Sequence, residues 1–110
     1  MRKIDNNVQN AFWADGKYSG GNTLVYNNAG ETVVQLYTTE IAKKPVWDQK
    51  IVSIHYWIHP TNTTLARIGG IIEPLGYKIN KKKWEVIVTD IETKQKRLIK
   101  PNTWHTIYTF

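Results

Sequence analysis

The C-terminal third of the sequence concentrates the residues best suited to holding phosphate groups. Residues 77–110 carry seven Lys and one Arg against three carboxylates, a net charge of +5, whereas the other 76 residues carry only +1. An excess of positive charge on one part of a folded chain attracts polyanions through Coulomb attraction and counterion release. We therefore expect a phosphate-bearing partner, either a nucleotide or a nucleic acid.

The first basic group is the run Lys81-Lys82-Lys83, which Tyr77 precedes and Trp84 follows. Three adjacent lysines on a tight turn predict a basic hairpin tip whose ammonium groups reach phosphates, while Tyr77 or Trp84 offers a ring for base stacking. The alternative is a solvated turn whose charge keeps a sheet edge soluble.

The second basic group comprises Lys94, Lys96, Arg97 and Lys100. In an extended segment Lys94, Lys96 and Lys100 share one face, and Arg97 lies on the other. Phosphate contacts position a nucleic acid without reading its sequence, and no helix-turn-helix pattern is present. Sequence-specific DNA reading is therefore not expected.

A glycine-rich segment, Gly16–Thr23, has the composition of an anion-binding loop, with Lys17 and Ser19 as additional donors. It lacks the Walker spacing, so it is not a P-loop. If the ligand is a small nucleotide, we expect this loop, Arg67 and an aromatic ring to form its binding site. The alternative is that the segment is a flexible loop ahead of the first strand.

Histidines supply the one enzymatic hypothesis. His59-Pro60-Thr61 has the His-x-Thr form of two-histidine phosphoesterases, which need a second such motif for acid and base roles. The segment His105-Thr106-Ile107 does not supply that second motif, because its hydroxyl comes one residue earlier than in His-x-Thr. The sequence also contains no cysteine, which excludes a thiolate zinc site. We therefore expect no catalytic residues, no metal site and no cofactor.

Five Trp and six Tyr are many for one small core. Exposed Trp and Tyr mark binding surfaces for proteins as well as for bases. An aromatic patch that inhibits a host enzyme is thus the alternative function, and self-association into a homo-oligomer would cover the same surface.

The 110 residues predict one α+β domain over residues 23–110, preceded by an irregular arm over residues 1–22. Alternating β-branched and aromatic residues predict strands at 23–26, 32–38, 50–58, 84–89, 97–100 and 103–110. The spacing of Leu65, Ile68, Ile71 and Leu75 predicts one amphipathic helix over about 61–73, ending before Pro74. The expected order is ββ-β-α-βββ, a mostly antiparallel sheet with the helix on one face and with Ile54 and Ile71 in the core.

No signal-peptide core and no apolar stretch long enough to span a bilayer occurs in the sequence. We therefore expect a cytoplasmic protein without a membrane partner.

Several fragments resemble a group of small tailed-phage proteins of similar length: Val8–Phe12, Gly16–Thr23, Ile41–Lys44, Trp57, Thr63–Arg67 and Lys81–Trp84. The resemblance implies a phage context and carries no assigned chemistry. It favours a role in host takeover or counter-defence. Together with the basic groups, it predicts a non-enzymatic phage protein that sequesters a nucleotide messenger or a nucleic acid.

Overall fold

The computed structural model describes residues 2–58, 60–83 and 85–108. In chain order this part contains α1 (Lys3–Trp13), β1 (Tyr18–Gly20), β2 (Thr23–Asn28), β3 (Glu31–Leu36), β4 (Thr39–Pro45), β5 (Ile51–Ile54), α2 (Asn62–Ile72), a 3-10 turn η1 (Glu73–Leu75), β6 (Tyr77–Lys82), β7 (Glu85–Asp90), β8 (Lys96–Ile99) and β9 (His105–Tyr108). The protein is therefore of the α+β class, and the predicted order of strands and central helix is confirmed.

The strands form two antiparallel sheets. The larger sheet has the order β1-β2-β3-β4-β5-β9, and the smaller sheet has the order β6-β7-β8. Within each sheet, neighbouring strands also follow one another in the sequence, except that β9 pairs with β5 after the chain has made α2 and the smaller sheet. The basic C-terminal third is therefore divided between the smaller sheet and the edge strand β9.

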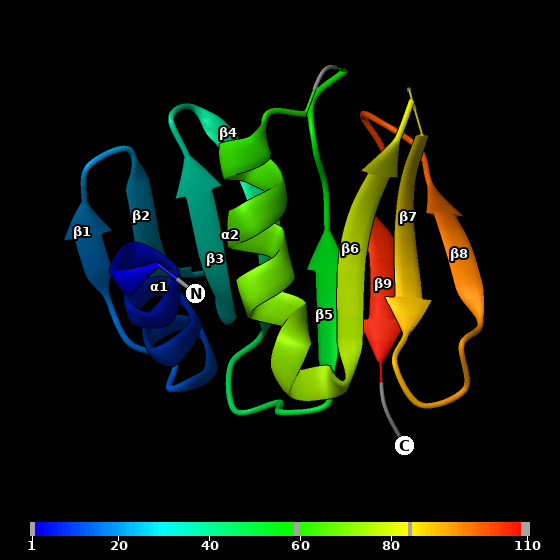
Figure 1. Cartoon of the computed structure of the whole chain (residues 1–110). Coiled ribbons are helices and arrows are strands. Elements are labelled where there is room, and N and C mark those ends of the chain that lie inside the picture. Colours follow the sequence, from blue (N-terminus) through cyan, green and yellow to red (C-terminus); the bar gives the residue numbers. More distant parts are fainter. Residues whose placement is uncertain (1, 59, 84, 109–110) are drawn as a thin grey trace.

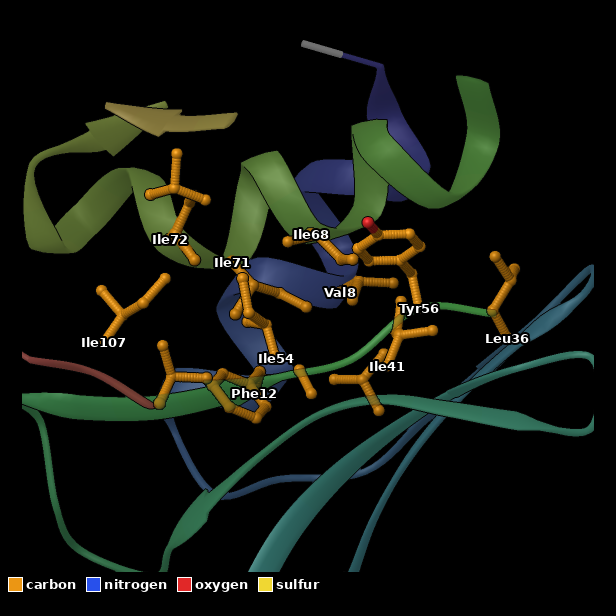
Figure 2. Packing of buried hydrophobic residues seen from close by; sticks show 14 of the residues in the cluster. Val8, Phe12, Leu36, Ile41, Ile54, Tyr56, Ile68, Ile71, Ile72 and Ile107 are labelled. Atoms are coloured by element: carbon orange, nitrogen blue, oxygen red, sulfur yellow. The ribbon is translucent and has the colours of Figure 1, made fainter. Parts of the chain in front are cut away.

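Two helices and the smaller sheet lie side by side over one face of the larger sheet (Figure 1). Apolar side chains from all three pack against inward-facing residues of the larger sheet, including Ile54 and Ile107 (Figure 2). Burial of this apolar surface is the main favourable term in folding. The predicted core positions Ile54 and Ile71 are confirmed, since both are buried.

Helix α2 begins and ends as its sequence predicts. The hydroxyl of Thr61 accepts a hydrogen bond from the Thr64 amide at 3.1 Å, and the helix ends at Ile72, just before Pro74. A Cβ on Gly69 would lie 3.2 Å from Cγ2 of Ile79, so this glycine permits the close approach of α2 to β6.

The prediction of an irregular arm over residues 1–22 is wrong, because Lys3–Trp13 form α1 and Tyr18–Gly20 form β1, which pairs with β2. Val8 and Phe12 are fully buried on one face of α1. Its side chains also reach α2, where Gln9 donates to the Gly70 carbonyl at 2.6 Å and the Trp13 indole donates to the Ile71 carbonyl at 2.9 Å. The helix is mostly polar, so tertiary packing rather than a long apolar stripe holds it in place.

No helix of the described residues is both long and apolar enough to cross a bilayer.

Candidate phosphate-binding surface

One face of the smaller sheet carries lysines from both of its outer strands. The strand register pairs Lys78 on β6 with Thr89 on β7, and Thr89 with Lys96 on β8. Paired residues point to the same side of a sheet, and side chains alternate along each strand, so Lys82 shares this side with Lys78. We call this surface, with Lys78, Lys82 and Lys96, the lysine face.

Two apolar residues lie in the middle of the lysine face. Ile87 pairs with Leu98 on one side and with the polar Asn80 on the other, and 47% of Leu98 is exposed. Two strand spacings separate Lys78 from Lys96 by about 10 Å, and four residues separate Lys78 from Lys82 by about 13 Å. The surface thus has separated cations at its margins, with Ile87 and Leu98 between them.

The charges of the lysine face have no ion-pair partners among the residues that the structure describes. In this part of the chain the ion pairs are Arg2–Asp5, Lys44–Asp15 and Arg67–Asp5. Glu85 is paired in register with Lys82 and is the one carboxylate in register on this face. The row of Lys78 and Lys96 is therefore available to an external anion.

Burial of the opposite face explains why Lys78, Lys82 and Lys96 face outward. Val86, Val88 and Ile99 are buried against the helices and the larger sheet, so the residues alternating with them must face outward.

Other predicted binding residues of this region lie at the turns. Lys83 has a φ of 57° at the tip between β6 and β7, and Lys94 has a φ of 65° between β7 and β8. Both side chains are exposed. The predicted hairpin tip is therefore present, while Trp84, its expected stacking ring, lies outside the described residues.

Residues of the inward face of this sheet hold it to β9. Arg97 donates to the Thr106 carbonyl at 2.7 Å, and the Tyr77 hydroxyl donates to the Tyr108 carbonyl at 3.1 Å. Arg97 thus lies on the face opposite Lys96, as alternation predicts, and Lys81 shares its side of the sheet. Lys100 directly follows β8 and donates its backbone amide to Nε2 of His105 at 3.1 Å.

Three further predicted residues lie elsewhere. The segment with Lys17 and Ser19 forms the hairpin β1–β2, at the edge of the larger sheet opposite β9. Arg67 is buried in α2, where its guanidinium donates to the carboxylate of Asp5 and to the hydroxyl of Thr23. These residues do not join the lysine face, and Arg67 serves the core.

The described histidines are engaged in structural contacts. His55 stacks on Trp104 with ring centroids 5.0 Å apart, and its Nδ1 donates to the Glu40 carbonyl at 3.0 Å. Lys43 lies over the same indole, 4.3 Å from the ring centroid. His59 lies outside the described residues, among which no group of His, Cys, Asp or Glu has the arrangement of a metal site.

Two strongly exposed aromatic residues border a small cavity that sequence reasoning did not identify. Tyr37 and Trp57 are 69% and 64% exposed, and they line a cavity of about 170 Å³ together with the start of α2. Trp47, which is 84% exposed, lies in the separate loop between β4 and β5. The aromatic residues therefore do not form one continuous patch.

Comparisons with curated proteins and with solved structures gave no match. Residues 1–109 match the family described as Kyanoviridae Gp96 protein, so the chain belongs to this family of phage proteins.

Proposed function

We propose that this chain is a phage accessory protein that binds nucleic acid on the lysine face, without catalysing a reaction, in host takeover or counter-defence. The observation that carries the proposal is the placement of Lys78, Lys82 and Lys96 on one open sheet face, with no ion pair to any described residue. Exposed lysines spread over one side of a sheet suit the sequence-independent contacts that proteins make with phosphate backbones.

The shape of the surface favours a polymer over a small nucleotide. Small ligands bind in concave sites of roughly 300 to 1,000 Å³ that enclose most of their surface. The cavity next to Lys96 and Arg97 holds only about 110 Å³, and Asp90 also lines it. A wider hollow of about 450 Å³ lies beside Lys78, but the carboxylates of Asp5 and Glu73 line it and disfavour an anionic ligand. The lysine face instead offers several separated cations, which suit phosphates spread along a chain.

Salt dependence of binding tests this proposal. Fluorescence anisotropy with a labelled single-stranded oligonucleotide, at a series of salt concentrations, gives the slope of log affinity against log salt. For the variant K78A/K82A/K96A we expect this slope to become shallower by about 2, because each lost phosphate contact removes about 0.7 for a single strand.

A matched control is K3A/K17A/K50A, which removes the same total charge from exposed positions outside the lysine face. We expect it to change the slope much less. Equal losses in the two variants would mean that net charge alone drives binding, and they would contradict a defined surface. Melting temperatures of both variants confirm that the fold is intact.

Inhibition of a host protein is the second candidate, and Trp47 favours it. The Trp47 indole is 84% exposed although its backbone has a φ of 75°, a conformation that bulky residues rarely adopt. Under this candidate, W47A rather than K78A/K82A/K96A relieves any growth defect that the chain causes in its host. The opposite pattern supports nucleic-acid binding.

A further inference from the structure

The cavity between Tyr37 and Trp57 lies where α2 begins. Tyr37 and Trp57 line it together with Leu36 and Ile41, both of which are buried. We propose that this cavity holds one unstacked base of a single-stranded nucleic acid, an inference that rests on the proposed function.

The backbone of Tyr37 is fixed in an unfavourable conformation. Its φ is 56°, its amide donates to the Asn22 carbonyl at 2.8 Å, and its carbonyl accepts from the Gln35 side chain at 2.9 Å. The Asn22 side-chain amide also donates to the Tyr37 hydroxyl at 3.3 Å. Positive φ is costly for a large side chain, and here burial of the ring does not repay it, since the ring is mostly exposed. The arrangement therefore holds a ring ready at the mouth of the cavity.

The chemistry of the cavity suits a neutral planar ring. Its polar side chains include the hydroxyl-bearing Thr39, Thr61 and Thr64, and none of the described residues that line it is charged. Hydroxyls both donate and accept hydrogen bonds, as the edges of nucleobases do. At about 170 Å³ the cavity is smaller than the usual site for a drug-sized ligand, so it has room for a single ring.

The surroundings of the cavity suit the phosphates that accompany such a base. The connection from β5 to α2 and the tip between β6 and β7 lie at the same end of the molecule (Figure 1). The loop that starts at Lys100 is held beside Trp57, because the Asn102 amide donates to the Tyr56 carbonyl at 2.9 Å. A single strand with one base in the cavity can therefore place its neighbouring phosphates near Lys100 and near Lys83 at the tip between β6 and β7.

Single-stranded and duplex oligonucleotides separate this inference from general phosphate binding. Base stacking on an aromatic ring requires an unpaired base, whereas phosphate contacts form with both substrates. For Y37N and W57A we expect affinity for a labelled 12-nucleotide single strand to fall about five- to a hundredfold, and affinity for the matching duplex to stay within about twofold. Asn tolerates positive φ, so Y37N keeps the turn.

The control is W47A, which removes an even more exposed indole from another loop. We expect unchanged affinity for both oligonucleotides. If Y37N and W57A leave single-strand affinity unchanged while K78A/K82A/K96A lowers it, the base site is overturned and the proposed function stands.

A wild-type chain that binds no oligonucleotide would overturn the proposed function. A separate titration then tests the cavity, by following the indole NMR signal of Trp57, assigned with W57F. A shift on adding adenosine or thymidine supports the base site. A shift produced only by N-acetyl-tyrosinamide would identify a site for a protein side chain. No shift with any of the three compounds would mean that the cavity binds no ring. Both results overturn the inference.

Discussion

Lys44 Nζ lies 2.6 Å from Asp15 Oδ1, and both side chains are almost completely buried. The hydroxyl of Thr32 donates to the same carboxylate oxygen at 2.7 Å, and the Trp47 amide donates to Oδ2 at 2.9 Å. The Lys44 ammonium also lies 5.6 Å from the centre of the Trp13 ring. One buried charge pair thus joins the end of α1 to β3, β4 and the loop after β4.

Asp15→Asn is expected to destabilise the protein by about 3 to 5 kcal/mol, because it leaves the Lys44 charge buried without a counterion. Asn tolerates the φ of 55° at this position, so backbone strain does not contribute. Urea unfolding followed by circular dichroism measures the loss. The double variant D15N/K44M should recover most of it, and a loss below about 1 kcal/mol in D15N would show that Lys44 finds water instead.

The Lys44–Asp15 pair also makes the free energy of unfolding depend on pH in the acid range. Burial alone would raise the pKa of Asp15, but hydrogen bonds from Lys44, Thr32 and the Trp47 amide, together with the Lys44 charge, outweigh burial and lower the pKa below its ordinary value of 3.8. Because the pKa of Asp15 is lower in the folded state, its ionised carboxylate stabilises the folded protein at pH values above the pKa of the unfolded state. This stabilisation is lost as the pH falls through the pKa of the folded state.

We therefore expect the free energy of unfolding to decrease below about pH 4 more steeply for the wild type than for D15N/K44M. Between about pH 5 and 8 the difference between the two should stay constant. Parallel curves from pH 5 down to pH 2 would contradict this assignment.

Ile71→Ala is expected to cost about 2 to 5 kcal/mol, since Ile71 is fully buried between α2 and the larger sheet. Ile91→Ala is the matched control, because Ile91 is 44% exposed and its loss should fall within about 0.5 kcal/mol. Similar unfolding free energies for the two variants would mean that α2 packs differently.

Tyr56→Phe tests the link between the two layers of the fold. The buried Tyr56 hydroxyl donates to the Ile99 carbonyl at 2.5 Å, so its removal leaves that carbonyl without this partner, at an expected cost of about 1 to 3 kcal/mol in urea unfolding. Tyr77→Phe removes an exposed hydrogen bond and should cost less than 1 kcal/mol. Equal costs would contradict a special role for the buried hydroxyl.

The pH dependence of unfolding at alkaline pH provides a second test of the buried Tyr56 hydroxyl. Burial raises the pKa of Tyr56 above 10.0, so the stability that its neutral form contributes is present below pH 10 and is lost as pH rises through the folded pKa. Part of the alkaline destabilisation of the wild type should therefore be missing in Y56F, as measured by urea unfolding between about pH 9 and 12.

Local signals in the sequence predicted much of the fold. The strands predicted at 23–26 and 32–38 correspond to β2 and β3, which pair through a tight turn with positive φ at Ala29 and Gly30. The helix predicted over about 61–73, ending before Pro74, corresponds to α2. Helix α1 was missed because Val8 and Phe12 carry its buried face almost alone, and their partners lie on distant elements. The phage origin expected from short fragments is confirmed at the level of the family.

The surfaces were harder to predict because they depend on contacts between strands. Alternation separates Lys96 from Arg97, but only the register across Thr89 places Lys78 in line with Lys96. Tyr37 and Trp57 are distant in sequence, and they meet only because β4 and β5 are neighbours in the larger sheet. Pairing of this kind is not encoded in any single segment.

Strand β8 is an edge of the smaller sheet, and its side chains include Lys96 and Arg97. An uncharged open strand edge invites pairing with the same edge of another molecule, and charged residues oppose such pairing by mutual repulsion. Neutralising the charges of β8, by mutation or by a bound polyanion, would remove the repulsion that opposes this pairing. Under the proposed function, molecules crowded along one nucleic acid would then be free to join edge to edge, and occupancy itself would promote assembly.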